Sequence, residues 1–272
     1  MLTSREIDMF VSTLQKLKGI DLSSYRENFL QRRLNSRIEA TNSENLFAYF
    51  NIIKKEVDEY NRFLEAISIN VTEFFRDPDV FDFFRKNCFR EIIQRKVVLN
   101  HSVIRFWSAA CASGEEAYSL AIIIREELRD KLGNFRIRVW GTDVDKDALE
   151  EAKKAEYSQR SLNEVDSTIL NRYFINVAKD LYRLKAEVRD LVKFSTHNLM
   201  SDAALKYVDV IFCRNLMIYL RRKQQEELLM NLYKALNPGG YLVIGKAESI
   251  LGSPKELFVP VDLNRKIFQK RR

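Results

Sequence analysis

The chain has 272 residues, enough for one large domain or two modest ones, and 46% of them are hydrophobic, which allows a proper core. Eight glycines and four prolines argue against a low-complexity or largely disordered chain. The formal net charge of +7 reflects either solubility or an acidic partner, such as nucleic acid, anionic lipid or a carboxylate-rich protein.

The first 70 residues show the apolar period of helices. Capping boxes, in which Ser or Thr is followed three residues later by Glu, are expected at Thr3, Ser24 and Thr41. Apolar residues at helical spacing follow each of them, and one further helical stripe comes before residue 70. Four short helices are therefore predicted, forming an all-α domain over residues 1–69.

A linker and a bridging helix follow over residues 70–99, and from residue 100 strands alternate with helices. Strands are predicted at 103–109, 136–142, 208–213 and 241–245, and helices at 115–130, 145–155 and 221–236. This alternation predicts an α/β domain over residues 100–272, with a mostly parallel sheet between helices. Leu236–Gly240 is expected to be a turn, and two apolar runs after residue 255 are spaced like a closing hairpin.

The alternation stops between about residues 157 and 195. Leu181–Leu184 and Leu191–Phe194 instead alternate in polarity, as short antiparallel strands do. We interpret this region as a small antiparallel β insertion into the α/β domain.

The most informative segment runs from Trp107 to Leu120. A buried strand is followed by small residues, and a helix then begins with Glu115 and Glu116. Such corners hold nucleotide-like ligands in α/β folds, but two acids at a helix start would repel a phosphate. The corner therefore favours a ligand with hydroxyls and positive charge, such as S-adenosylmethionine. Only Gly114 of the three-glycine dinucleotide fingerprint is present, which disfavours nicotinamide or flavin.

Two other strand ends carry polar residues. Asp143 ends the second strand, where an acid commonly bonds a ribose; the alternative, a helix cap, is better met by Asp145. Arg214 and Asn215 end the fourth strand and would face the ligand crevice, unless the strand merely reaches the surface there. The prolines that follow this strand in methylases of base amines are absent, which counts against an adenine or cytosine N-methylase.

The linker segment 70–77 allows two interpretations. Phe74 and Phe75 fit a core and Thr72 fits a helix cap, whereas Asn70, Thr72 and Arg76 could equally close over a ligand. The segment by itself does not decide between them.

Five segments together resemble the chemotaxis-receptor glutamate methyltransferases of the CheR-type family. In chain order they are NVTEFFRD at 70–77, WSAACASGEEAYSLAI at 107–122, GTDVD at 141–145, FSTHNL at 194–199 and DVIFCRNLMIYL at 209–220. They are highly specific in combination and extend over nearly the whole chain. The resemblance implies an N-terminal helical domain, a Rossmann-like class I methyltransferase domain that uses S-adenosylmethionine, and a small antiparallel subdomain inserted in it.

The resemblance also implies the site residues and the reaction. Its donor contacts correspond to Asn70, Thr72, Arg76, Glu116, Asp143, Asn198, Leu199, Arg214 and Asn215. Arg76 and Tyr219 would lie closest to the transferred methyl group, as the catalytic pair. The implied reaction moves a methyl group from S-adenosylmethionine to glutamate side chains of methyl-accepting chemotaxis receptors and leaves S-adenosylhomocysteine.

A basic stripe on the second helix is the candidate substrate-docking surface. Arg26, Arg33 and Arg37 share one side of that helix, although on pattern alone the stripe could be a solvated face. With the resemblance, we expect it to dock on a glutamate-rich helix of the receptor's cytoplasmic domain. The region 174–181 contains no glycine, which favours direct docking over tethering through a receptor tail.

Other features bear on cofactors, location and competing functions. Three dispersed cysteines and two histidines make no zinc-binding pattern, so no metal is expected. No segment approaches the roughly 20 apolar residues of a membrane span, so we expect a cytoplasmic protein without membrane insertion. A monomer is also expected. The alternative function is a nucleic-acid methyltransferase, which the positive net charge and the versatile fold favour. The absence of the base-amine methylase prolines after the fourth strand counts against it, so no nucleic-acid partner is expected. A non-catalytic binding module is disfavoured by the intact site residues.

Overall fold

A computed structural model describes residues 2–18, 22–67 and 72–271. The chain divides into two compact units, one of Met1–Asn70 with Met217–Gln225, the other of Val71–Leu216 with Glu226–Arg272. Each unit has its own buried hydrophobic core.

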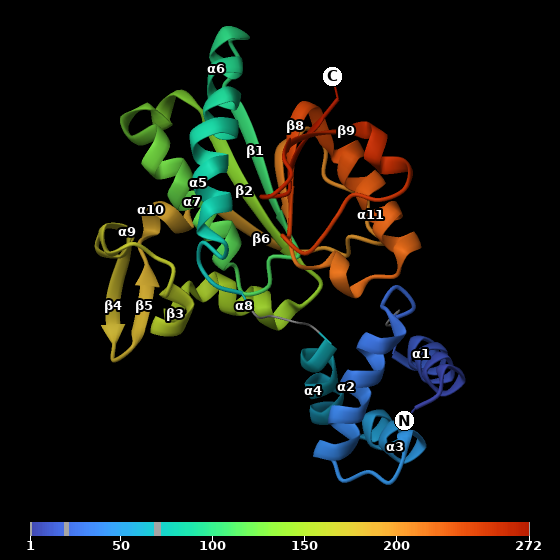
Figure 1. Ribbon diagram of the computed structural model, residues 1–272. Helices are drawn as coiled ribbons and strands as arrows, with labels where there is room; N and C mark the ends of the chain where they lie inside the picture. The colour runs from blue at the N-terminus through green and yellow to red at the C-terminus, as the bar shows by residue number, and fades with distance from the viewer. Residues whose placement is uncertain (1, 19–21, 68–71, 272) are drawn as a thin grey trace. The chain divides into compact units, whose positions relative to one another are not determined.

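Four helices form most of the first unit (Figure 1), and their bounds are α1 (Ser4–Lys18), α2 (Glu27–Ala40), α3 (Leu46–Lys55) and α4 (Val57–Ile67). Their apolar stripes meet in a core that includes Ile7, Phe10, Leu14, Leu34, Tyr49 and Phe63. The predicted all-α character of this region is confirmed. Burial of the apolar stripes against one another stabilises these short helices.

One of the three expected capping boxes is present. The Thr3 amide donates to Glu6 Oε2 at 2.7 Å, and the Glu6 amide donates to Thr3 Oγ1 at 3.3 Å. The box expected at Ser24 is wrong, because Glu27 is the first residue of α2 and its carboxylate accepts from Ser4 Oγ at 2.6 Å. A tertiary partner has replaced the local one. The box expected at Thr41 is also wrong, because α3 is capped by Asn45, whose Oδ1 accepts from the Ala48 amide at 2.9 Å.

A segment far along the chain completes the first unit. The Arg26 amide donates to the Tyr219 carbonyl at 2.8 Å, and Tyr25 forms an antiparallel bridge with Leu220. The rings of Phe29 and Tyr219 lie 5.0 Å apart. Residues 217–225, including the 3₁₀ turn η4 (Met217–Tyr219), therefore belong with the helices by contact and not by sequence.

A seven-stranded sheet forms the centre of the second unit (Figure 1). Its order is β6-β2-β1-β7-β8-β10-β9, with the first five strands parallel and β10 antiparallel to both of its neighbours. The strands are β1 (Val103–Ala109), β2 (Arg136–Asp143), β6 (Val192–Thr196), β7 (Val208–Cys213), β8 (Leu236–Ile244), β9 (Phe258–Asp262) and β10 (Ile267–Lys270). The predicted Rossmann-like α/β fold and the closing hairpin are confirmed.

The helices from residue 78 onward join these strands. They are α5 (Pro78–Phe83), the π-helix η1 (Phe84–Phe89), α6 (Arg90–Val98), α7 (Glu115–Leu128), α8 (Lys146–Lys154), α9 (Ser167–Tyr173), α10 (Ala186–Arg189) and α11 (Arg222–Ala235). Short 3₁₀ turns lie at η2 (Arg129–Asn134), η3 (Gln159–Leu162) and η5 (Ser253–Leu257).

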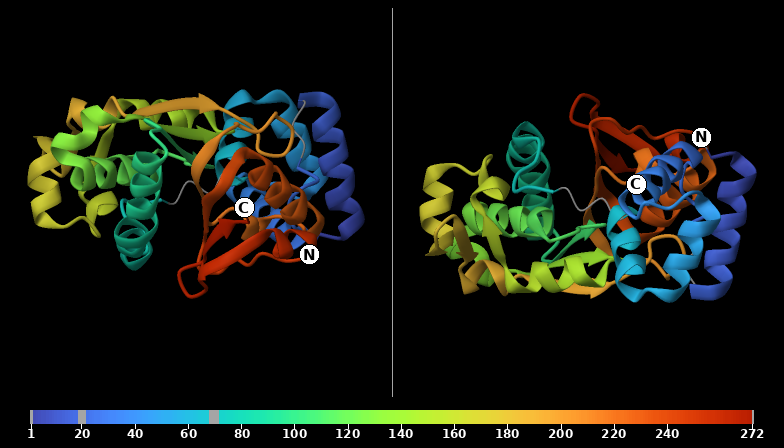
Figure 2. Two further views of the ribbon diagram at one scale, coloured as in Figure 1. Left: turned by 90° about the horizontal axis from the view of Figure 1, so that it is seen from above. Right: turned by 90° about the horizontal axis from the view of Figure 1, so that it is seen from below.

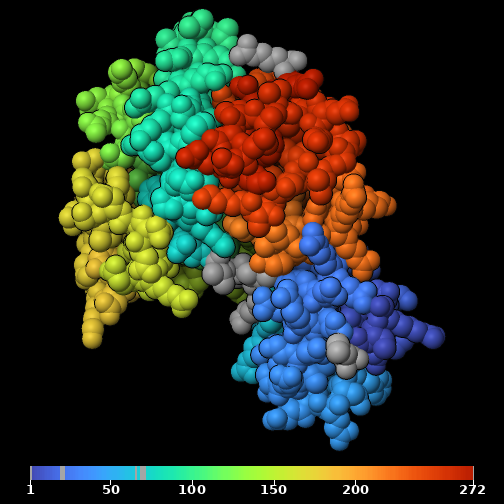
Figure 3. Space-filling model, in the orientation of Figure 1, coloured from blue at the N-terminus to red at the C-terminus, as the bar shows by residue number. Residues whose placement is uncertain are grey.

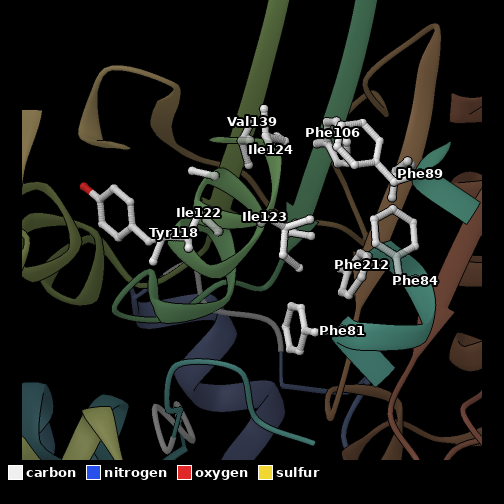
Figure 4. Packing of buried hydrophobic residues seen from close by; sticks show 14 of the residues in the cluster. Phe81, Phe84, Phe89, Phe106, Tyr118, Ile122, Ile123, Ile124, Val139 and Phe212 are labelled. Atoms are coloured by element: carbon white, nitrogen blue, oxygen red, sulfur yellow. The ribbon is translucent and has the colours of Figure 1, made fainter. Parts of the chain in front are cut away.

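An aromatic cluster packs one face of the sheet against the π-helix η1 (Figure 4). Phe106 of β1 and Phe212 of β7 meet Phe84 and Phe89 of η1, with edge-on ring pairs at 5.1 Å for Phe84–Phe212 and 5.3 Å for Phe89–Phe106. All four rings are fully buried, and each contributes about 1.5–3 kcal/mol by burial. The cluster holds the strands whose ends form the site described below.

A small antiparallel sheet is inserted between β2 and β6, as predicted. Its order is β3-β5-β4, and its strands are β3 (Glu156–Ser158), β4 (Phe174–Ala178) and β5 (Leu181–Leu184). In both views of Figure 2 the insertion (yellow) and the β9–β10 hairpin (red) lie at opposite ends of the second unit.

Two details of the sequence prediction are wrong. Leu191–Phe194 does not join the insertion, since β6 pairs in parallel with β2, where it satisfies that strand's open edge. The expected turn Leu236–Gly240 lies inside β8 as an irregular stretch, with a register shift opposite Val208 and Val210. The glycines there produce a bulge and not a chain reversal.

Candidate functional site

The carboxyl ends of β1, β2, β6 and β7 meet at one edge of the sheet, where ligands bind in open α/β folds. After β1 the backbone is left-handed at Ala110 (φ 61°), Ala112 (φ 47°) and Gly114 (φ 91°). A Cβ at Gly114 would lie 2.8 Å from Ala152 Cβ and 2.9 Å from Phe194 Cζ, so this position requires glycine. The corner is therefore compact and leaves backbone open to a ligand.

Asp143 ends β2 beside this corner. Its Oδ2 accepts from the Ala112 amide at 2.8 Å, and its Oδ1 accepts from the Asp145 amide at 3.0 Å. The cap of α8 is Asp145, which accepts from the Asp147 and Ala148 amides. Burial raises the pKa of Asp143, and the amide bonds oppose that shift. Asp143 is thus not needed as a cap, and its carboxylate has lone pairs left for ligand hydroxyls.

Glu116, in the first turn of α7, faces the end of β1 and the end of β7. Ser108 Oγ donates to Glu116 Oε1 at 2.7 Å, and Arg214 Nη1 lies 3.8 Å from Glu116 Oε2. Burial raises the pKa of Glu116, while Arg214 and the Ser108 hydrogen bond oppose the shift. Serine and arginine thus orient a carboxylate that stands over the compact corner.

Arg214 connects the end of β7 to the loop before α5. Its Nη1 donates to the Arg76 carbonyl at 2.9 Å, its Nη2 pairs with Asp77, and its guanidinium lies 5.5 Å from the centre of the Phe81 ring. Among the residues that the structure describes, its buried Nε has no hydrogen-bond partner. Arg214 therefore positions the Arg76 loop and retains one donor for a bound acceptor.

Asn215 follows with a left-handed backbone (φ 60°), and a residue absent from the sequence prediction holds it. The Asn215 amide donates to Glu248 Oε2 at 3.2 Å, and the Gly245 amide donates to the same oxygen at 2.5 Å. Glu248 is only 3% exposed. No local pattern indicated its contact with the site, since Asn215 lies 33 residues earlier in the chain.

Thr72 and Arg76 line a cavity of about 340 Å³ with Glu73, Arg160 and Ser161. The loop is fixed by two backbone donors, Phe74 to the Ser161 carbonyl at 3.0 Å and Phe75 to Ser119 Oγ at 2.9 Å. Phe74 is buried, as the core interpretation expects, and Thr72 and Arg76 line the cavity. Their contact with a ligand stays a prediction. Asn70, another predicted contact, lies outside the described residues.

Asn198 and Leu199 follow β6 at the same edge of the sheet. Asn198 bonds locally, with its amide donating to Asp202 Oδ2 at 2.8 Å and its Oδ1 accepting from the Met200 amide at 2.9 Å. Leu199 is buried. The preceding His197 amide donates to the Asp143 carbonyl at 2.9 Å, which brings this loop to the end of β2.

The second predicted catalytic residue, Tyr219, belongs to the first unit, whereas Arg76 belongs to the second. The basic stripe also lies in the first unit, and its arginines differ. Arg37 forms an ion pair of 2.5 Å with the buried Glu59, Arg26 Nε donates to the Leu220 carbonyl at 2.9 Å, and Arg33 lies over the Phe29 ring. Arg37 therefore has a structural partner that the helical pattern did not indicate.

The described residues show neither a candidate metal cluster nor a membrane-spanning helix. No cluster of three or more His, Cys, Asp or Glu side chains there could hold a metal ion. No helix there has the length and apolarity to cross a membrane.

Comparison with known families decides the affiliation of the chain. Residues 70–267 match the family described as "CheR methyltransferase, SAM binding domain", and residues 5–68 match "CheR methyltransferase, all-alpha domain". The chain belongs to the CheR methyltransferase family. The resemblance stated from the five sequence motifs is thereby confirmed.

Individual CheR relatives align over most of their length. A "Chemotaxis protein methyltransferase" of Listeria innocua is 31% identical over 242 residues, which cover 89% of this chain and 89% of that protein. "Chemotaxis protein methyltransferase 2" of Vibrio cholerae is 30% identical, covering 92% and 87%. The Borreliella burgdorferi "Chemotaxis protein methyltransferase" is 28% identical, covering 93% and 90%.

The site residues suit the donor that the family name implies. S-adenosylmethionine carries a ribose diol, an ammonium and a sulfonium, and Asp143 and Glu116 have partly exposed side chains whose carboxylate oxygens suit hydroxyls and cations. The small residues of the corner leave room for the ligand, and the buried Nε of Arg214 can donate to an acceptor on it.

Proposed function

We propose that this CheR protein transfers the methyl group of S-adenosylmethionine to glutamate side chains of chemotaxis receptors, forming glutamyl methyl esters. The observation that carries the proposal is the meeting of Asp143, Glu116 and Arg214 around the small-residue corner. The curated relatives named as chemotaxis protein methyltransferases support the choice of acceptor.

The chemistry requires alignment more than proton transfer. A glutamate has a reference pKa near 4.3 and is ionised at neutral pH, so no general base is needed. The donor supplies an electrophilic methyl group. Arg76 and Tyr219 would orient the acceptor carboxylate in line with that methyl group and exclude water. Asp143 and Glu116 would hold the donor, with Thr72, Asn198, Leu199, Asn215 and Asn70 as further contacts.

Receptor docking through α2 is the second part of the proposal. Arg26, Arg33 and Arg37 would present positive charge to a glutamate-rich receptor helix, which steers association and weakens with salt. Arg33 has the most direct part, because Arg37 is paired with Glu59 and Arg26 bonds a backbone carbonyl. Docking would be direct, without a receptor tail, and by a cytoplasmic monomer.

The test uses radiolabelled S-adenosylmethionine with a receptor cytoplasmic fragment and with bulk RNA and DNA as parallel acceptors. Base-labile label on the receptor fragment is expected, since esters hydrolyse in base. Base-stable label on nucleic acid, or no label on receptor despite donor binding, would contradict the proposal.

A further inference from the structure

The cavity beside the loop before α5 is lined partly by residues that are not among the predicted donor contacts. Its lining residues in the described part of the chain come from two segments, Thr72, Glu73 and Arg76 of the loop and Arg160 and Ser161 of η3 in the insertion. The two segments are joined by the bond from the Phe74 amide to Ser161, and the Phe74 ring lies edge-on to Tyr157 at 4.8 Å. In the space-filling view the insertion (yellow) lies against the α5–α6 segment (teal) (Figure 3). The fold itself therefore brings Arg160 to the cavity.

The charges of the cavity leave it ready for an anion. Two guanidiniums, of Arg76 and Arg160, and one carboxylate, of Glu73, line it. Within the described part of the chain, no hydrogen-bond or ion-pair partner is found for the exposed Arg160 side chain. Arg76 also interacts electrostatically with Glu116, whereas the Arg160 side chain is exposed, and the planar fork of arginine matches a carboxylate in two-bond geometry.

We propose that Arg160 acts with Arg76 to bind the carboxylate of a reactant in this cavity, so that the insertion supplies a positioning residue to the site. The inference rests on the proposed function, which provides two carboxylates, that of the acceptor glutamate and that of the donor's amino-acid end. Both share the chemistry that two guanidiniums recognise, and measurement separates them.

The experiment compares the full-length protein with its Arg160→Gln variant. Donor and product affinities are measured by calorimetry with S-adenosylmethionine and S-adenosylhomocysteine, and KM and kcat with the receptor fragment. Loss of one charge-assisted pair should raise either the donor dissociation constant or the receptor KM about tenfold. A rise confined to the receptor KM assigns the acceptor carboxylate, and a rise confined to the donor dissociation constant assigns the donor carboxylate.

Two further variants separate binding from general effects. Lys179→Gln makes the same charge change on an exposed residue of the insertion outside the cavity, and should alter neither constant. Glu73→Gln removes the opposing carboxylate and should shift the affected constant in the opposite direction. Equal constants for Arg160→Gln and Lys179→Gln would overturn the inference. Calorimetry needs no receptor, so failed receptor labelling would contradict the proposed function while leaving the donor arm of this test intact.

Discussion

Two largely buried carboxylates, of Asp143 and Glu116, carry the negative charge of the proposed donor site. At Asp143 burial raises the pKa and the backbone amides of Asp145 and Ala112 oppose it; at Glu116 burial raises the pKa and Arg214 opposes it. Groups fixed in the fold thus favour the charged form of each carboxylate and oppose the effect of burial.

Replacing Asp143 by Asn removes the charge while keeping the size of the side chain. Because hydrogen bonds to a charged group are worth about 1.5–3 kcal/mol, affinity for S-adenosylhomocysteine should fall at least about tenfold in calorimetry. Asp145→Asn is the matched control, since Asn caps helices as well as Asp does. Equal losses in both variants would contradict a ligand role for Asp143.

The buried Glu115 is expected to make the free energy of unfolding depend on pH. It is 3% exposed, and burial raises its pKa to about 7, opposed by its hydrogen bond from Ser113 Oγ. A carboxyl with a raised folded-state pKa costs stability as pH rises from its unfolded pKa through its folded one. Glu115→Gln should therefore be more stable than the natural protein by about 3 kcal/mol at pH 8, with the difference vanishing near pH 4. Urea unfolding across this range measures it, and a constant difference would contradict the argument.

At the scale of elements, the site depends on the close packing of β2 against β6 and the corner. A Cβ at Gly141 of β2 would lie 2.5 Å from Phe194 Cε1 and 3.2 Å from Cys111 Sγ. Gly141 does not have a positive φ. Glycine is required here by lack of space for a Cβ and not by backbone conformation. The aromatic side chain of β6 occupies the volume that a larger residue would need.

Gly141→Ala should accordingly destabilise the protein by about 1–3 kcal/mol, the usual cost of overpacking. Gly133→Ala is the control, since a Cβ there meets nothing within 4 Å. The free energies of unfolding of both variants are measured in urea. If Gly141→Ala proved no less stable than Gly133→Ala, Phe194 would have moved aside without cost.

At the scale of the whole molecule, the proposed reaction joins a donor site in one unit to a basic helix in the other. The net charge of +7 supports long-range attraction to an acidic receptor helix. Charge placement on α2 then decides which residues contribute, and Arg33 and Arg32 provide a comparison. They are neighbours in sequence but point in directions about 100° apart around the helix.

Arg33→Glu should raise the KM for the receptor fragment about tenfold at low ionic strength, because it turns attraction into repulsion. The effect should shrink as salt is added, since the Debye length falls to about 8 Å at 0.15 M. Arg32→Glu, with the same charge change off the stripe, should have a smaller effect. Similar KM values for the two variants would place docking elsewhere.

Much of the fold could be predicted because its signals are local. The strands predicted at 103–109 and 208–213 have the same bounds as β1 and β7, since buried parallel strands are continuous apolar runs in the sequence. Asp143 and Arg214 could be singled out because each directly follows or ends such a strand. Glu248 and Arg160 could not, since Glu248 meets Asn215 and Arg160 meets the Arg76 cavity across long separations in sequence.

By itself, the sequence determined the α/β class, the helical N-terminal region, the inserted antiparallel sheet and the CheR family, because apolar period and contiguous motifs are properties of neighbouring residues. The tertiary structure decided that β6 joins the main sheet, that residues 217–225 complete the helical unit, and that Arg37 pairs with Glu59. Each of these depends on which distant group satisfies an open strand edge, an exposed ring or a buried charge. No local pattern contains that choice, because many partners would satisfy the same group and only packing selects one.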